Sequence, residues 1–286
     1  MKRILAATDF SELGNAAALR AAQLALQHGA ELRCLHAAPS EVALRSIFAD
    51  VTDSFVDDFR VATRKQADSF GHTLHGVRGQ PVAVECLDGS PHRVMLEAAE
   101  DWGADLLVAG AHGQGALEQL FLGGTISKMM AGAECPLLIV RKAQQGAYGN
   151  VLAAIDLQAR SKDVLLAALS MTPGKIEVFH AIQPPLQQRM RMYGVSDDIV
   201  SRMTSQHREH VAAVVKNLIA SVPGADRLIP RTGEGHPNSA ILEALGARRA
   251  DLLVIGKHGG RRFAERVMGS VPKFLAYNAS CDILIV

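Results

Sequence analysis

An internal repeat is the feature that most constrains how this chain can fold. The sequence ADLLVAGAHG at residues 104–113 returns as ADLLVIGKHG at residues 250–259, with eight of the ten positions identical. Each residue of the second run follows its match by 146 positions, as Gly256 follows Gly110. Other segments repeat at nearly the same spacing: residues 5–9 at 152–156, residues 89–91 at 235–237, and residues 135–140 at 281–286. Similarity at one spacing along the whole chain indicates a duplicated domain.

The duplication predicts two domains, residues 1–143 and residues 144–286. A chain of 286 residues has the length of two domains, since one domain commonly takes ~100–200 residues. The predicted boundary falls in the polar, glycine-containing segment 142–149, between two apolar runs. With 48% hydrophobic and 21% charged residues, each half can bury a core of its own.

The charge balance argues against a polyanionic partner. Lys and Arg together number 30 and Asp and Glu 29, so the formal net charge is +1. Without a broad positive field, the chain is not expected to bind nucleic acid or an anionic membrane surface.

The N-terminus and the cysteines both favour the cytoplasm. The first apolar run stops at Thr8 and Asp9, too early for a signal-peptide core of ~7–15 residues. No run approaches the ~20 apolar residues of a membrane span, so membrane insertion is not expected. The cysteines are scattered without a CxxC pair, which favours reduced thiols in a reducing compartment: Cys34, Cys86, Cys135 and Cys281.

Short apolar runs alternate with helical patterns in each half. Runs such as residues 106–109 lack strict polar alternation, which is typical of strands covered on both faces of a parallel sheet. The predicted strands are residues 4–7, 32–37, 81–86, 106–109 and 137–140, then 150–156, 175–182, 228–231, 252–255 and 281–286; the predicted helices of the first half are 13–28, 51–75 and 93–102. This order predicts an α/β fold: two tandem, doubly wound, five-stranded, mainly parallel sheets. Each ligand crevice should lie beyond the carboxyl ends of the first and fourth strands.

A glycine motif follows the fourth strand of each half. In the first half it is Gly110-x2-Gly113, nine residues, then Gly123-Gly124-Thr125; in the second it is Gly256-x2-Gly259, nine residues, then Gly269-Ser270-Val271. Glycine lets the backbone approach a ligand closely. A helix that opens on a glycine offers free amides and the positive end of its dipole to a phosphate. The motif therefore predicts a cradle for a ribose and a phosphate chain.

On these residues the chain resembles the universal stress protein family, whose nucleotide-binding members carry G-x2-G-x9-G-[S/T]. The resemblance covers essentially all of both halves and includes residues 8–12, the Leu35-His36-Ala37 segment, the Gly89-x-Pro91 turn and the Cys135-Pro136 strand. It implies a Rossmann-like fold of the adenine nucleotide alpha hydrolase type in each half. It also implies that the fifth strands, 137–140 and 283–286, pair as an intramolecular pseudo-dimer, and that the chain can form a homodimer.

The resemblance also implies a ligand and its contacts. The expected ligand is ATP, ADP or AMP, with Mg²⁺ as a candidate counter-ion; the strand-one Asp and the residue after the strand-two His contact adenine, and the glycine motif holds ribose and phosphates. The site residues implied are Asp9, Ala37, Gly110, Gly113, Gly123, Gly124 and Thr125 in the first half, and Asp156, Ala181, Gly256, Gly259, Gly269, Ser270 and Val271 in the second.

Each half departs from the family pattern. Gly124 replaces the usual Ser or Thr and so removes a hydroxyl contact. Pro272, in a first helical turn, supplies no N–H. Leu157-Gln158 follows Asp156 in place of a small turn residue, which could reshape the adenine side. Between the glycines the second half holds Lys257, Arg261, Arg262 and Arg266, whereas the first holds no cation and carries Glu118. Phosphate is therefore expected to prefer the second half, and adenine the first.

Other polar and flexible residues allow a functional and a structural interpretation. His112 and His258 could contact the ligand or bond the loop backbone, and His36 and His180 are expected to be packed structural residues. His207 and His210 share a helical face, but no third metal ligand is evident, so a solvated face is favoured and no metal is expected. Met190, Met192 and Met203 surround Tyr193-Gly194; packing under a loop is favoured over an apolar groove or partner surface.

Three functional hypotheses follow. The first is a nucleotide-binding stress-response regulator with an unidentified regulatory protein partner. The second is a nucleotide-free scaffold that binds a small ligand, a lipid or a protein. The third is slow ATP hydrolysis or autophosphorylation. No dedicated catalytic residues are predicted, because the Walker lysine motif, a G-x-S-x-G elbow and an HExxH sequence are all missing from the sequence.

Overall fold

The computed structural model describes residues 1–48, 51–113, 122–143, 146–183, 187–257 and 268–286. The contacts of the chain divide it into two compact units, Met1–Ala147 and Tyr148–Val286. Tyr148, four residues after the boundary expected from sequence, packs within the second unit. Its ring is buried, its hydroxyl donates to Oδ2 of Asp282 at 2.7 Å, and its carbonyl accepts from Thr172 Oγ1 at 2.7 Å.

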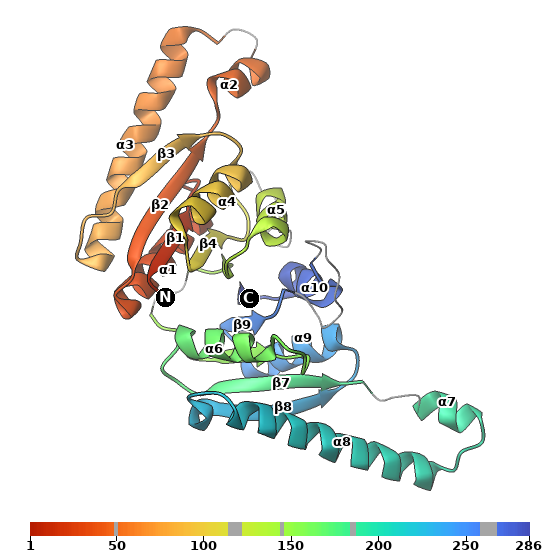
Figure 1. Ribbon diagram of the computed structural model, residues 1–286. Helices are drawn as coiled ribbons and strands as arrows, with labels where there is room; N and C mark the ends of the chain where they lie inside the picture. Colours follow the sequence, from red (N-terminus) through yellow and green to blue (C-terminus); the bar gives the residue numbers. More distant parts are fainter. Residues whose placement is uncertain (49–50, 114–121, 144–145, 184–186, 258–267) are drawn as a thin grey trace. The chain divides into compact units, whose positions relative to one another are not determined.

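The first unit is a parallel sheet covered on both faces by helices (Figure 1). Its strands lie in the order β3-β2-β1-β4-β5, and every described pairing between them is parallel. The elements are β1 Arg3–Ala7, α1 Glu12–His28, β2 Glu31–Ala38, α2 Glu41–Ile47, α3 Asp53–Arg78, β3 Val84–Asp88, α4 Pro91–Trp102, β4 Leu106–Gly110, α5 Gly124–Gly132 and β5 Leu137–Val140. Helices α1 and α3 pack on one face of the sheet, and α4 packs on α5 over the other.

The second unit repeats this architecture with the order β8-β7-β6-β9-β10. Its elements are β6 Val151–Ala154, α6 Ser161–Met171, β7 Ile176–Ile182, α7 Gln187–Met192, α8 Asp197–Ala220, the 3₁₀ turn Ala225–Arg227, β8 Leu228–Glu234, α9 Pro237–Arg248, β9 Leu252–Ile255, α10 Ser270–Asn278 and β10 Asp282–Ile285. The predicted α/β class, with two tandem, doubly wound parallel sheets of five strands, is confirmed.

The four-residue strands are buried along their whole length, as their apolar runs predicted. All four residues of β5, β6, β9 and β10 are buried. The helices around them begin and end at residues with capping chemistry. Ser11 Oγ accepts from Gly14 N at 3.1 Å where α1 begins, and Gly29 ends that helix in the left-handed conformation, with φ 60°.

Two elements of the first unit differ from the sequence-based expectation. The third strand was expected at 81–86, but β3 covers Val84–Asp88, because its register with β2 begins at the pair Cys34 and Val84. Pro81 has no N–H to donate to such a ladder. The short helix α2 was not predicted; Ser40 caps it by accepting from Ala43 N at 3.3 Å.

The methionine segment of the second unit also differs from expectation. Packing under a loop was favoured for it, but Met192 is 81% exposed, Tyr193 84% and Met203 52%. The turn between α7 and α8 therefore presents apolar side chains to solvent.

Candidate functional site

Each unit has a pocket where the sequence predicted a crevice. The pocket of unit 1 has a volume of about 720 Å³ and lies against the ends of β1 and β4 and the start of α5. The pocket of unit 2 has a volume of about 510 Å³ and lies against the ends of β6 and β9 and the start of α10. Carboxyl ends of parallel strands beside a helix N-terminus are where doubly wound sheets bind ligands.

The structure brings the predicted site residues together. In unit 1 all seven line one pocket: Asp9, Ala37, Gly110, Gly113, Gly123, Gly124 and Thr125. In unit 2 six line the corresponding pocket: Asp156, Ala181, Gly256, Gly269, Ser270 and Val271. The seventh, Gly259, lies outside the described residues, as do His258, Arg261, Arg262, Arg266 and Glu118.

In unit 1 the strand-one carboxylate is held by the turn that follows it. Oδ1 of Asp9 accepts from the backbone N–H of Ser11 at 3.0 Å and from its hydroxyl at 2.5 Å. A Cβ built on Gly14 would lie 2.4 Å from this Oδ1, and a Cβ built on Gly113 would lie 2.2 Å from Oδ2. Both positions therefore need glycine while the carboxylate keeps this place.

The first glycine of the motif, Gly110, is required for a different steric reason. A Cβ on Gly110 would lie 2.9 Å from the carbonyl carbon and oxygen of Leu13, at the start of α1. Because those are backbone atoms, they cannot move aside as a flexible side chain can. The glycine lets the end of β4 approach the start of α1 closely.

In unit 2 the carboxylate is held by a different serine. Oδ1 of Asp156 accepts from Gln158 N at 2.9 Å and from Ser161 Oγ at 3.1 Å. Ser161 opens α6 and also lines the pocket, next to Arg160. The guanidinium of Arg160 lies 3.5 Å from the Asp163 carboxylate and adds a cation that the sequence analysis did not anticipate.

The turns after the first strands of the two units share a backbone conformation. Leu157 was expected to reshape the adenine side, but Phe10 and Leu157 adopt the same left-handed φ of 61°. A non-glycine residue there is uncommon, and the conformation costs on the order of 1 kcal/mol or more. The pocket linings differ at the turn and just after it: Phe10 lines the unit 1 pocket, whereas Arg160 and Ser161 line that of unit 2.

His36 and His180 have equivalent structural bonds. His36 Nδ1 lies 3.0 Å from the carbonyl oxygen of Thr8, and His180 Nδ1 lies 2.9 Å from that of Ile155. A carbonyl only accepts, so Nδ1 carries the proton in both rings. Each histidine therefore ties the second strand of its unit to the turn after the first. His36 also stacks on Phe10, with ring centroids 4.4 Å apart.

One side of each pocket is formed by the start of a helix that has no side-chain cap. Gly123 precedes α5 and Gly269 precedes α10, and neither helix receives a side-chain hydrogen bond at its N-cap. Gly123 N donates to Ala111 O at 2.9 Å, which fixes the entry into α5. The first-turn N–H groups of such a helix are oriented to bind an anion.

Two further cations lie near the start of α4 beside α5. Burial, Lys128 and Arg93 together lower the pKa of His92, whose Nδ1 bonds Ser90 Oγ at 2.8 Å. Lys128 and Arg93 both lie outside the segments between the motif glycines, to which the expected charge difference was confined.

Helix α3 forms a wall of the unit 1 pocket that the sequence did not reveal. Phe59, Thr63 and Gln66 line this pocket, whereas α8 supplies no lining residue in unit 2. These three residues belong to an ordinary amphipathic pattern, and nothing in their spacing marks a ligand site. Only the packing of α3 on α1 and β3 places them there.

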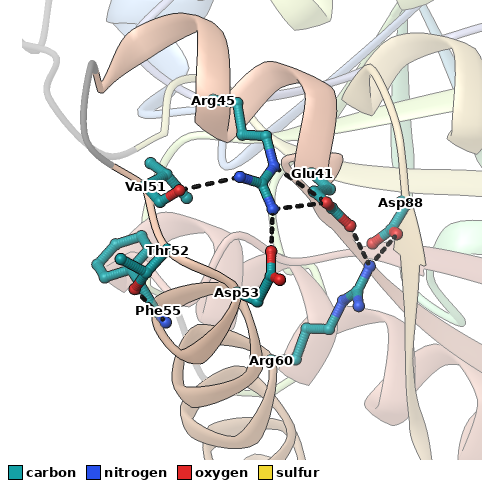
Figure 2. A network of polar contacts seen from close by, with 8 residues as sticks. All are labelled: Glu41, Arg45, Val51, Thr52, Asp53, Phe55, Arg60 and Asp88. Carbon is teal, nitrogen blue, oxygen red and sulfur yellow. Dashed lines mark hydrogen bonds and ion pairs between the residues drawn. The ribbon is translucent and has the colours of Figure 1, made fainter.

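A surface network ties α3 to its neighbours near this wall (Figure 2). Arg45 of α2 donates through Nε to Glu41 at 3.0 Å and through Nη1 to the carbonyl of Val51 at 2.9 Å, and it also pairs with Asp53. Arg60 of α3 lies 3.9 Å from Glu41 and 3.7 Å from Asp88, the last residue of β3. Together these contacts link α2, α3 and the end of β3.

No cluster of three or more His, Cys, Asp or Glu side chains suited to a metal ion occurs among the described residues. Within the same residues, no helix is long and apolar enough to cross a lipid bilayer.

Fold and site together define a tandem α/β protein of the doubly wound type, with a glycine-lined pocket at the end of each sheet. The sequence profile of the universal stress protein family matches residues 1–141 and 147–286. The chain therefore belongs to the universal stress protein family, with two family domains in tandem.

Individual relatives agree with this assignment. A universal stress protein of Mycolicibacterium smegmatis is 24% identical over 298 residues, which cover 99% of this chain and 96% of the relative. One from Thermus aquaticus is 33% identical over 147 residues, 49% of this chain and 98% of the relative. The crystal structure of a universal stress protein from Archaeoglobus fulgidus shares the fold, with a TM-score of 0.67 at 15% identity, covering 99% of this chain and 97% of that one.

Proposed function

We propose that this universal stress protein binds an adenine nucleotide in its pockets and acts as a nucleotide-dependent regulator of a stress response. The observation that carries the proposal is the duplicated pairing of a glycine-lined strand end with an uncapped helix start inside one pocket. ATP, ADP or AMP would place its phosphates at the starts of α5 and α10, with Mg²⁺ as a candidate counter-ion. The adenine would lie toward Asp9 and Ala37 in unit 1, and toward Asp156 and Ala181 in unit 2.

The first-turn amides supply the binding chemistry in this proposal. Gly124, Thr125 and Ile126 open α5, and their N–H groups lie at the positive end of the helix dipole. In unit 2, Ser270 and Val271 have N–H groups to offer, but Pro272 has none. Unit 1 therefore has one more backbone donor for phosphate, whereas unit 2 has the Ser270 hydroxyl.

A pair of substitutions tests the amides without disturbing the helix. Gly124→Pro removes one N–H at the first helical position, where proline is tolerated. Gly123, with φ −62° and ψ 149°, already has the conformation that a residue before proline prefers. Gly124→Ala keeps the N–H and is the control; a Cβ there meets no atom within 4 Å.

The measurement is calorimetric titration of the full chain with ATP, ADP and AMP. We expect binding to the wild type and to Gly124→Ala. Gly124→Pro should weaken binding at one site about 10-fold or more, because a hydrogen bond to a charged group contributes about 1.5–3 kcal/mol. Ser270→Pro and Ser270→Ala form the corresponding pair in unit 2. If the wild type binds no adenine nucleotide, the proposal is wrong.

One observation favours the second candidate, a nucleotide-free module that meets a lipid, a metabolite or a protein. Met192, Tyr193 and Met203 are exposed around the start of α8, and flexible apolar side chains suit an adaptable contact. Mass spectrometry of a denatured extract separates the candidates: a co-purified adenine nucleotide supports the first, and a different small molecule supports the second.

Location and assembly remain part of the proposal. Each of the four cysteines carries a thiol rather than a disulfide bond, which supports a reducing compartment such as the cytoplasm. Pairing of the two fifth strands as a pseudo-dimer, a homodimer of the whole chain, and an unidentified regulatory protein partner stay predictions from the family resemblance.

A further inference from the structure

We propose that Gln66 of α3 reads the base in the unit 1 pocket and makes this pocket select adenine over 6-oxopurines. This inference rests on the proposed nucleotide binding and names a specificity-determining residue for it.

The strand-one carboxylate of unit 1 is already engaged by the protein. Oδ1 of Asp9 accepts two hydrogen bonds from Ser11, and Oδ2 lies against Gly113. A carboxylate held in this way has reduced capacity to read the edge of a base. A second polar side chain in the pocket would add to the base recognition that Asp9 and Ala37 provide.

Gln66 is such a side chain. It lines the unit 1 pocket and has no hydrogen-bond partner among the residues that the structure describes. Thr63, one turn earlier on the same helix, is not available, because it is buried and its hydroxyl donates to the Phe59 carbonyl at 2.9 Å. The carboxamide of Gln66 is therefore the side chain of the α3 wall with both a donor and an acceptor to offer a ligand.

A carboxamide matches adenine in a specific way. It can accept from the exocyclic N6 amine and donate to N7, the two-bond pairing through which glutamine and asparagine recognise adenine. Hypoxanthine presents oxygen O6 and N7, two acceptors, so one of the two hydrogen bonds is lost. Phe59 also lines the pocket and offers an aromatic face on which either base can stack without discrimination.

Unit 2 lacks this wall. Arg60 of α3 and Arg208 of α8 can be aligned, because each pairs with the last residue of the third strand of its unit. In this alignment Val214 corresponds to Gln66, and His207 corresponds to Phe59. No residue of α8 lines the unit 2 pocket. Recognition of the base by a side chain of the long helix is therefore assigned to unit 1, where that helix is α3.

The polar network of Figure 2 holds this wall in place. Arg60 is adjacent to Phe59 on α3 and lies within 4 Å of both Glu41 and Asp88. Arg60 does not line the pocket, so it acts as a positioning residue for α3. Exposed ion pairs of this kind contribute little individually, and their role here is to set the position of the helix.

The test compares AMP with inosine 5′-monophosphate (IMP) on the full chain. Ser270→Pro serves as the background in every titration, so that binding reports on unit 1. We expect the chain with Gln66 to prefer AMP over IMP by about 10-fold or more, the range of a two-bond base contact. Gln66→Val, which places the unit 2 residue in unit 1, should bring the two affinities within about 2-fold of each other and leave the affinity for ribose 5-phosphate unchanged.

Two controls make the result decisive. Lys65→Val changes an exposed neighbour that does not line the pocket and should keep the AMP preference, whereas Gln66→Asn, which retains the carboxamide, should keep part of it. If AMP binds and Gln66→Val retains the full preference, the inference is overturned while the proposed function stands. If neither nucleotide binds the wild-type chain, the proposed function itself is overturned, and the inference with it.

Discussion

Gly113, the second glycine of the loop motif, lies against the carboxylate of Asp9, more than a hundred positions earlier in the chain. A Cβ on Gly113 would lie 2.2 Å from Oδ2 of Asp9, closer than real side-chain contacts allow. The carboxylate cannot simply turn away, because Ser11 holds Oδ1 through two hydrogen bonds. The second glycine of the motif and the strand-one aspartate therefore pack directly against each other.

This arrangement predicts that the cost of a side chain at Gly113 depends on Asp9. Gly113→Ala should destabilise unit 1 by about 1–3 kcal/mol, the usual cost of overpacking, whereas the same substitution in an Asp9→Ala background should cost much less. Urea unfolding followed by the fluorescence of Trp102, the single tryptophan, reports on unit 1. Equal costs in both backgrounds would show that the two residues do not meet.

Alanine substitutions at Gly110 and at Gly124 are predicted to change stability in opposite directions, although both glycines belong to the motif. Gly110→Ala places a Cβ 2.9 Å from the backbone of Leu13, so α1 must shift and unit 1 should lose about 1–3 kcal/mol. Gly124→Ala meets no atom within 4 Å at the start of α5 and should stabilise the helix by up to about 1 kcal/mol. Thermal unfolding monitored by Trp102 measures both. A neutral Gly110→Ala would contradict the close approach of β4 to α1.

Asp105 is predicted to contribute stability that is lost at acid pH. Burial raises the pKa of its carboxyl, but hydrogen bonds from the backbone N–H groups of Lys2 and Arg3 outweigh this, and the net pKa is lowered. The contribution is therefore complete above the unfolded-state pKa of about 3.9 and disappears as the pH falls toward the lower folded-state value.

Asp105→Asn isolates that contribution. At pH 7 the free energy of unfolding of the variant should be lower by about 1 kcal/mol, the typical net contribution of a hydrogen bond. The reason is that the amide oxygen accepts more weakly than the carboxylate at the start of β1. Below pH 3 the variant and the wild type should become nearly equal in urea midpoint. A difference that stays constant from pH 7 to pH 2.5 would exclude the carboxylate as its source.

The sequence predicted the features that depend on repetition and on local pattern. The apolar runs located the buried strands, and the motif glycines located the pockets, because main-chain geometry at a strand end is encoded by the glycines themselves. The α3 wall could not be predicted in this way, because Phe59 and Gln66 reach the pocket only through the packing of a helix distant in sequence. The same holds for Arg160, which corresponds to no motif position.

The bounds of β3 were mispredicted for a related reason. The apolar content of residues 81–86 marks a strand, but its register is set by the partner strand, which pairs Cys34 with Val84 and Ala38 with Asp88. An edge strand has a single neighbour in the sheet, so its own pattern constrains its position weakly. A sequence pattern therefore fixes the existence of such an element better than its bounds.

Cys34 is predicted to be chemically inert in the folded protein. Burial, with the nearby Glu85 and Cys86, raises the pKa of its thiol to about 12, so almost none is thiolate at pH 8, and thiolate is the reactive form. Iodoacetamide at pH 8 should therefore leave Cys34 unmodified in the native chain and alkylate it within minutes in urea, with peptide mass spectrometry as the readout. The pKa of the half-buried Cys86 is also raised by burial, so it should react more slowly than a free thiol but before Cys34. Rapid native alkylation of Cys34 would mean that β2, the strand that carries His36 and Ala37, opens to solvent in the native chain.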